Sequence, residues 1–155
     1  MIEAHNDCMR HKRSKTSAML FDANREELLY SLWQELSNHT YSISPSNAFV
    51  VTHPKPREVF AADFRDRIVH HWIALRIEPI LMQMLIPNTF SCIKGRGTLA
   101  MQKAVSNAIQ ANNGLYICKI DIEGFFNSIS RMRLWQKMES LIMQYYQGGD
   151  KDDLL

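Results

Sequence analysis

Apolar residues recur at the spacing of an amphipathic helix in four stretches of the chain. The clearest stretch is residues 22–38 (DANREELLYSLWQELSN), whose first turn is acidic and which Asp22 or Asn24 can cap. Its apolar positions form one stripe that we expect to pack in the core: Leu28, Leu29, Leu32, Trp33 and Leu36. The other predicted helices span about 63–84, about 98–111 and about 128–145.

Proline, glycine and small polar residues set the predicted limits of these helices. Pro79 predicts a kink or a break within 63–84. Thr98 can cap the next helix, and Asn112-Asn113-Gly114 stops it. The last helix begins at Ser128 or Ser130 and ends at Gly148-Gly149, and the tail KDDLL after it has no evident partner.

Three segments have the composition of strands. Phe49–Thr52 predicts a short strand and Val59–Phe60 a second fragment, while the prolines of HPKPRE (53–58) exclude a helix and favour a turn or a strand edge between them. Leu115–Ile122 is nearly continuous in apolar and β-branched residues, which is typical of a buried strand. The fold class is therefore α+β, with too few strands for a complete sheet, so the chain has the pattern of a piece of a larger fold.

Composition and charge place the chain among globular proteins of one domain. It has 155 residues, 46% apolar and 22% charged, and a net charge of +2 that indicates little about partners. Three scattered cysteines imply no disulfide framework and fit a reducing compartment. The longest apolar stretch, 72–86, is too short and too charged to span a bilayer, and residues 1–20 hold no signal peptide. We therefore expect a cytoplasmic protein without a membrane contact.

Residues 1–20 form a basic leader that we expect to be unstructured. Its run RHKRSK (10–15) is either a solvated, mobile terminus or an arm that contacts phosphate. His5, Cys8 and His11 lie at three-residue spacing, but three ligands in such a leader are a poor candidate for a metal site.

Basic residues gather in two places where an anion can bind. PREVFAADFRDRIVHH (56–71) carries Arg57, Arg65 and Arg67, and the planar guanidinium fork suits phosphate oxygens. For any single arginine, ordinary ion pairing with a neighbouring acidic residue is the favoured interpretation, and three are near enough: Glu58, Asp63 and Asp66. In KGRGT (94–98) two glycines leave backbone N–H groups open to an anion, although a simple capping loop explains this pattern equally well.

Asp121 is the most unusual acidic residue, because KIDIEGFF (119–126) places it in a predicted strand among isoleucines. An unpaired buried carboxylate is costly. Asp121 is therefore either a residue on the solvent face of a strand or a metal ligand.

Three blocks in order, PREVFAADFRDRIVHH (56–71), SCIKGRGT (91–98) and KIDIEGFFNSI (119–129), resemble the first blocks of bacterial reverse transcriptases. The likeness is greatest to enzymes of diversity-generating retroelements, with retron and group II intron enzymes as near relatives, and it covers about residues 41–130. It implies an RNA-directed DNA polymerase, a nucleotidyltransferase, of which this chain holds the fingers and the first part of the palm. The implied division is a leader over 1–20, a fingers-like region over 21–114 and the start of the palm over 115–155.

The resemblance also implies roles for individual residues. Asp121 and the backbone carbonyl of Ile122 would bind two Mg²⁺ ions, and Phe126 would lie under the sugar of the incoming dNTP, while Phe125 packs in the core. Arg57 would grip the triphosphate together with Arg65 or Arg67. Lys94 and Arg96 would contact the template backbone. The implied partners are an RNA template, a DNA primer and a dNTP, and an accessory retroelement protein is compatible with them.

The chain departs from that family in one decisive respect, because it holds no aromatic-x-Asp-Asp block. Asp152-Asp153 is no substitute, since it lies in a polar tail without a preceding apolar strand. We therefore expect a fragment that is inactive by itself. Two alternatives stay open: a nucleic-acid-binding fragment without catalysis, and a piece that a partner polypeptide completes.

Overall fold

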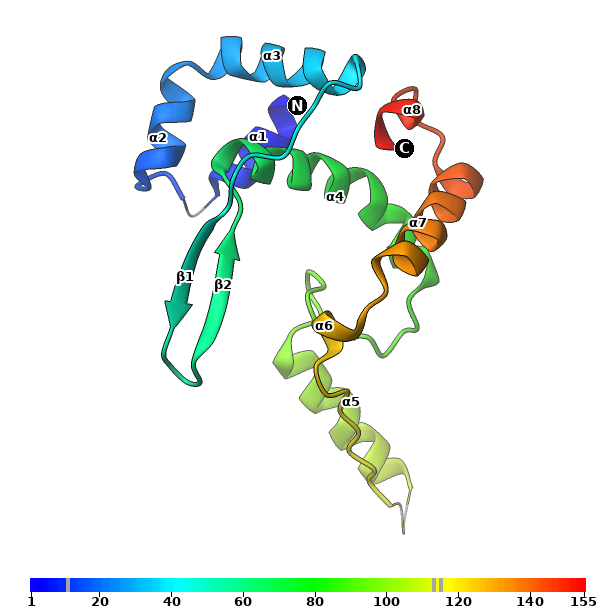
Figure 1. Ribbon diagram of the computed structural model, residues 1–155. Helices are drawn as coiled ribbons and strands as arrows, with labels where there is room; N and C mark the ends of the chain where they lie inside the picture. Colours follow the sequence, from blue (N-terminus) through cyan, green and yellow to red (C-terminus); the bar gives the residue numbers. More distant parts are fainter. Residues whose placement is uncertain (11, 113, 115) are drawn as a thin grey trace. The chain divides into compact units, whose positions relative to one another are not determined.

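The computed structural model describes residues 1–155 except 11, 113 and 115. The described residues form eight helices and one antiparallel sheet of two strands, so the predicted α+β class is confirmed (Figure 1). They divide into a first unit, Met1–Ile80 with Glu139–Leu155, and a second unit, Leu81–Met138. The division at residues 20 and 114 that the resemblance implies stays a prediction.

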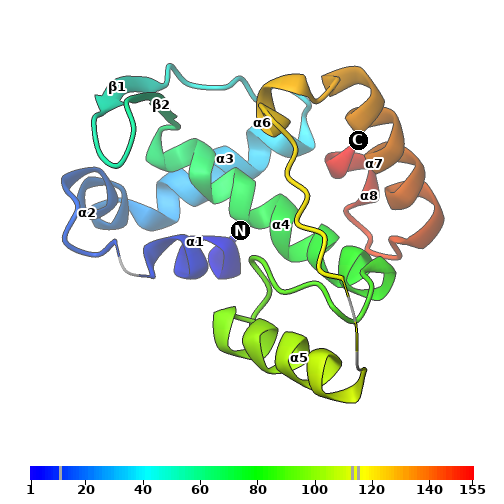
Figure 2. The same ribbon diagram turned by 90° about the horizontal axis from the view of Figure 1, so that it is seen from below.

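Helix α4 (Phe64–Met84) is the centre of the first unit. Helices α1 (Ile2–Met9), α2 (Thr16–Ala23) and α3 (Arg25–Ser37) pack around it (Figures 1 and 2). The core that they share is made of small, aliphatic and aromatic side chains, chiefly Ala4, Cys8, Ala18, Phe21, Leu29, Leu32, Phe64, Ile68, Val69 and Trp72. Burying one large apolar side chain contributes roughly 1.5–3 kcal/mol, so this cluster is the main source of stability in the unit.

The expectation of an unstructured leader is wrong. Residues 2–9 and 16–23 are helical, and they bury Ala4 and Cys8 in α1 and Ala18 and Phe21 in α2. These residues recur every three or four positions, which is the spacing of a helix face, but the basic run between them obscured the pattern. Within that run Arg13 and Lys15 are exposed. The grouping of His5 and Cys8 with His11 involves a residue outside the described part.

Helix α3 confirms the helix predicted over 22–38, but only part of its apolar stripe is buried. Leu29 and Leu32 are in the core, whereas Leu28 is 37% exposed and Trp33 49% exposed. Of the two predicted caps, Asn24 is the N-cap residue of α3, although its side chain makes no capping hydrogen bond. Asp22 belongs to α2.

Strands β1 (Asn47–Val51) and β2 (Arg57–Ala61) form an antiparallel hairpin that projects from the start of α4 (Figure 1). This confirms the two predicted strand fragments and the turn between them. Phe49 pairs with Val59, and Val51 pairs with Arg57 at the turn end. Because paired residues lie on one face of a hairpin, Arg57 shares a face with Phe49.

Helix α4 continues through Pro79 to Met84, so the alternative of a break there is wrong. Proline removes one backbone hydrogen bond, but the helix carries apolar residues on both sides of it. Ile77 is partly buried against the core and Ile80 is 8% exposed. Packing of these neighbours offsets the lost bond.

The second unit contains α5 (Thr98–Ala111) and the short α6 (Phe125–Ser128). Helix α5 confirms the predicted helix, but its N-cap is Gly97 and Thr98 is its first residue, so the predicted Thr98 cap is wrong. No residue of α5 is buried. The predicted stop after it includes residue 113, which lies outside the described residues.

The strand predicted over 115–122 is absent from its described part, residues 116–122. Tyr116 is 100% exposed and Ile120 82% exposed. Residue 115 lies outside the described residues. A strand requires a neighbour that pairs with its backbone groups, and no described segment pairs with this one. Sequence composition predicts the preference for a strand but does not supply the partner.

Helix α7 (Arg131–Tyr145) confirms the last predicted helix, and the Ser130 hydroxyl accepts the Arg133 N–H at 3.4 Å at its start. The expectation that the tail KDDLL (151–155) has no partner is wrong, because Lys151 donates to the Met143 carbonyl at 3.2 Å and Leu154 is buried. Asp150 forms an ion pair with Arg76 of α4 and accepts the Tyr146 hydroxyl at 2.5 Å. Burial by itself would raise the pKa of Asp150, but hydrogen bonds from Tyr146 and Arg76 hold it below its usual value.

The tail ends in helix α8 (Lys151–Leu154), whose Leu154 is buried in the core of the first unit. No helix in the described part of the chain has the length and apolar character needed to cross a membrane.

Candidate functional site

Asp66, in the first turn of α4, is the most deeply buried charged residue in the described chain, with 0% exposure. One of its oxygens accepts the Tyr41 hydroxyl at 2.7 Å and the Ser44 hydroxyl at 3.3 Å, and the other accepts the Ser44 N–H at 2.9 Å. Burial, and next the hydrogen bond to Asp66, raises the pKa of Tyr41. These donors, together with the N-terminal end of the helix, compensate the buried carboxylate.

Arg65 is fully engaged with the protein. Its guanidinium forms an ion pair with Glu35, lies 3.7 Å from Asp66 and donates to the Ser42 carbonyl at 3.1 Å. The same group lies over the Tyr41 ring, 5.0 Å from its centre. For Arg65 the ion-pairing alternative is therefore confirmed, since its guanidinium contacts protein groups on several sides.

Arg67 and Arg57 differ from Arg65. Arg67 donates from its Nε to the Ala62 carbonyl at 2.8 Å, and its terminal nitrogens have no hydrogen bond to the described residues. Arg57 is exposed at the turn end of β2 and, within the described chain, has no ion pair. The strand from Arg57 to Ala61 is about 13 Å long, so Arg57 lies near the turn end of the hairpin and Arg67 near its helix end.

The loop 93–97 in the second unit turns sharply before α5. Gly95 has a φ of +79°, a left-handed conformation that glycine adopts without strain. Arg96 donates to the Pro87 carbonyl at 3.2 Å, whereas Lys94 is exposed. Lys94 is thus the freer of the two cations that the resemblance assigns to the template.

Asp121 is exposed, and one of its carboxylate oxygens accepts the N–H of Ile122 at 3.0 Å. Downstream, Gly124 has a φ of +59° and is the N-cap residue that precedes α6. Phe126 is 86% exposed, and its ring meets that of Phe125 edge to face with 5.2 Å between centres. Phe125 is 47% exposed, so the expectation that it packs in the core is wrong.

The described residues do not fit a complete site for two Mg²⁺ ions. No three acidic, histidine or cysteine side chains gather among them as metal ligands. Asp121 is a single carboxylate, and the carbonyl of Ile122 is the only other ligand that the resemblance implies within this chain. Two divalent cations prefer several anionic oxygens, so this chain contributes at most part of their ligands.

We compared the chain with models of known protein families and with curated proteins. Neither comparison finds a match. The resemblance to reverse transcriptases therefore depends on the three sequence blocks.

The predicted site residues fall in both units. Arg57, Arg65 and Arg67 belong to the first unit, and the second holds the remaining five: Lys94, Arg96, Asp121, Ile122 and Phe126. Sequence reasoning missed the network around Asp66. Its only signal was an aspartate between the apolar residues Phe64 and Ile68, since Tyr41 and Ser44 lie 25 and 22 positions away.

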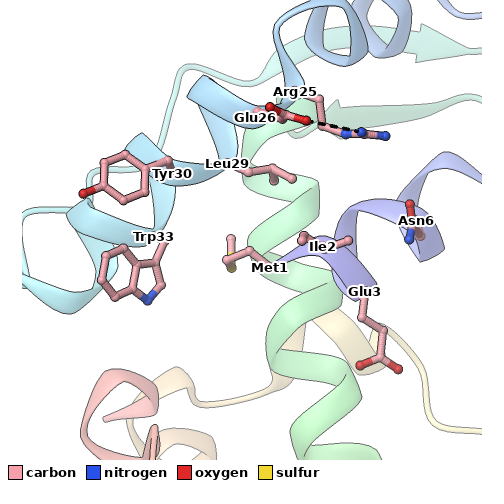
Figure 3. A pocket seen from close by; sticks show the side chains of 9 residues that line it. All are labelled: Met1, Ile2, Glu3, Asn6, Arg25, Glu26, Leu29, Tyr30 and Trp33. Atoms are coloured by element: carbon pink, nitrogen blue, oxygen red, sulfur yellow. Dashed lines mark ion pairs between the residues drawn. The ribbon is translucent and has the colours of Figure 1, made fainter.

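A pocket of about 680 Å³ opens between α1 and α3 in the first unit (Figure 3). Leu29 points toward Ile2 of α1 and toward Met1 before it, while Tyr30 and Trp33 line the α3 side. Its rim combines Glu3, Asn6, Arg25 and Glu26. None of the predicted site residues lines it, and its rim charges nearly cancel, so it shows no preference for an anion or a cation.

Proposed function

We propose that the chain supplies the fingers and the first part of the palm of an RNA-directed DNA polymerase. The observation that carries this proposal is the occurrence of three distinct blocks in the family's order: 56–71, 91–98 and 119–129. Each block alone is a weak pattern, because basic loops and strand aspartates are common. Their order along one chain of this length makes the polymerase the best explanation.

The first unit supports the proposal through its free cations. Arg57 is exposed, and Arg67 uses only its Nε within the described chain, which leaves its terminal N–H groups open to phosphate oxygens. Arg65 is bound to Glu35 and Ser42 and has no such capacity. We therefore propose that Arg57 and Arg67 bind the triphosphate. The sequence alone left the choice between Arg65 and Arg67 open.

The second unit supports the proposal through the alternation of residues 116–122. Tyr116, Cys118, Ile120 and Ile122 are at even positions, and Ile117, Lys119 and Asp121 at odd ones. In a strand these sets lie on opposite faces, so Asp121 would share the less apolar face with Lys119. A carboxylate that binds a solvated metal and lies beside a nucleotide is expected on this less apolar face. The opposite, apolar face would then pack against a core.

The alternative in which a partner polypeptide completes the piece has one specific observation in its favour. The backbone of 116–122 has no strand partner in the described chain, and Ile117, Ile120 and Ile122 are 76%, 82% and 62% exposed. Such a segment pairs readily with an added strand. We expect no polymerase activity from the chain alone with Mg²⁺, because one carboxylate cannot hold both ions.

Binding of an RNA template annealed to a DNA primer tests the part of the proposal that this chain performs by itself. In fluorescence anisotropy, Lys94→Ala and Arg96→Ala should weaken binding and each reduce the slope of log affinity against log salt by about 1. Arg133→Ala removes an exposed arginine outside the three blocks and is the matched control. Equal loss in all three variants would mean that only total charge matters and would count against the proposal.

Sugar discrimination tests the polymerase itself. In a completed enzyme, in which the chain is joined to a palm segment with an aromatic-x-Asp-Asp block, Phe126→Val should raise ribonucleotide incorporation because a smaller side chain admits the 2′-hydroxyl. Phe125→Val is the matched control, since it alters the adjacent ring, and it should leave discrimination unchanged. If Phe126→Val has no effect on sugar choice, the assignment of this residue is wrong.

A further inference from the structure

The hairpin β1–β2 is joined to α4 by two chain segments, which we call its legs. The first leg, residues 41–46, leads into β1, and the second, Ala62–Asp63, leads from β2 into α4. The strands themselves are mostly exposed, with only Val51, Val59 and Ala61 partly buried. A two-stranded hairpin is marginally stable without further packing, so its orientation depends on how the legs are held.

Asp66 and Arg65 hold the first leg. The Asp66 carboxylate accepts the Tyr41 hydroxyl and both the hydroxyl and the N–H of Ser44, at 2.7, 3.3 and 2.9 Å. Arg65 donates to the Ser42 carbonyl between them at 3.1 Å. Three residues of the leg are thus fixed to the first turn of α4.

Arg67 and Asp63 hold the second leg. Arg67 donates from its Nε to the Ala62 carbonyl at 2.8 Å, and the Asp63 carboxylate accepts the backbone N–H of Arg65 at 3.0 Å. The three consecutive residues 65–67 therefore reach both legs from one turn of the helix. Figure 1 shows the hairpin leaving α4 at this turn.

We propose that the contacts of Arg65, Asp66 and Arg67 with both legs set the angle at which the hairpin leaves α4. We call this set of contacts the clamp, and Asp66 is its central positioning residue. The substrate that the hairpin meets depends on the proposed function, in which the exposed Arg57 at its tip binds the triphosphate. The clamp itself is a property of the first unit and does not require that function.

The contacts distinguish this role from simple helix stabilisation. An acidic residue in a first turn stabilises a helix from an exposed position, and a surface aspartate would suffice for that. Asp66 is instead fully buried, and its donors come from a segment 22 to 25 residues away. Loss of a donor should therefore loosen the leg more than it unfolds α4.

The test is a distance measurement within the first unit by pulsed electron paramagnetic resonance. Spin labels are placed at Lys55→Cys in the turn of the hairpin and His70→Cys on the exposed side of α4, with the exposed Cys92 and Cys118 changed to serine. The unaltered clamp should give one narrow distance distribution. Tyr41→Phe, which removes a single hydroxyl, should raise the population of displaced orientations about fivefold.

Control variants distinguish a loosened hairpin from general loss of stability. They also test the clamp separately from the proposed polymerase function. Tyr30→Phe removes a hydroxyl from an exposed tyrosine of α3 and should leave the distribution narrow. Asp66→Asn should broaden it more than Tyr41→Phe while circular dichroism still reports folded helices. If Asp66→Asn does not fold, Tyr41→Phe decides alone. An unchanged narrow distribution in folded Tyr41→Phe overturns the clamp, whereas a broadened distribution with no effect on nucleotide affinity overturns only the proposed role of Arg57.

Discussion

The two units of this chain have similar local patterns but very different packing. Every buried residue of the described chain lies in the first unit, where Ile68 and Leu32 are 0% and 1% exposed. In the second unit α5 has an amphipathic sequence, yet Val105 and Ile109 are 49% and 47% exposed. An apolar pattern at helical spacing thus predicts helices in both units. Only in the first unit do other described residues pack against the apolar face of the helix.

The difference bears directly on function. The first unit has a packed core that fixes its side chains, whereas the candidate side chains of the second unit are exposed. The first unit fixes Arg65 and Asp66 in hydrogen bonds, whereas the second leaves Asp121 and Phe126 exposed. In the proposed polymerase, the fingers hairpin would be set by this chain, and the position of the palm aspartate would be set by strands that pair with 116–122.

The largest expected effect tests whether stability resides in the first unit. Ile68→Ala leaves a cavity in the core and should lower the free energy of unfolding by about 2–5 kcal/mol. Ile109→Ala makes the same change on the exposed face of α5 and should cost about 0.5 kcal/mol or less. Chemical denaturation followed by circular dichroism measures both. Equal losses would mean that α5 is packed as well as α4, and the comparison would fail.

A smaller effect is expected where the tail joins α4. Arg76 pairs with Asp150 and lies over the Trp72 ring, 4.4 Å from its centre. Both charged side chains are about one-quarter exposed, 25% and 27%, so solvent weakens the pair. Arg76→Met should lower the free energy of unfolding by about 1 kcal/mol, and Arg133→Met, the exposed control, should leave it unchanged. No loss in Arg76→Met would show that Leu154 holds the tail without the ion pair.

The smallest effect is a pH dependence specific to the first unit. His5 is 1% exposed, stacks on Phe21 and has no hydrogen bond from its ring within the described chain. Burial lowers its pKa, and neighbouring Asp22 and Asn6 only partly oppose the shift, while Arg25 adds to it. The folded state therefore binds fewer protons than the unfolded chain, and stability should be lost as the pH falls below 6.5.

The measurement is the melting temperature at several pH values from 7.5 downward. The unaltered chain should lose more stability on acidification than His5→Leu, in which the titrating group is removed. A parallel loss in both proteins would place the pH dependence elsewhere.

Sequence patterns predicted those elements that depend on neighbouring residues. Helices α3, α5 and α7 were predicted because their apolar spacing and end signals are local. The two strand fragments and the turn between them were predicted because the prolines at 54 and 56 interrupt two apolar runs, but their antiparallel pairing was not predicted. Helices α1 and α2 were missed since the charged run at 10–15 masked short apolar patterns on either side of it.

Features that depend on distant residues were not predictable in this way. The strand over 115–122 requires a pairing partner, which composition cannot supply. The engagement of Arg65 depends on Glu35, 30 positions away, and the burial of Asp66 depends on Tyr41. The sequence could therefore name the arginines of the candidate site but could not show that Arg65 and Arg67 bond to the segments beside the hairpin while Arg57 stays exposed.

Primer extension by the completed enzyme tests the central claim most directly. Asp121→Ala should abolish extension of a DNA primer on an RNA template while binding of that template stays largely intact, because the side chain meets metal and not nucleic acid. Asp152→Ala, in the tail, is the matched control and should extend normally. Extension that survives Asp121→Ala, or that is lost equally in Asp152→Ala, would contradict the assignment of this chain to the polymerase palm.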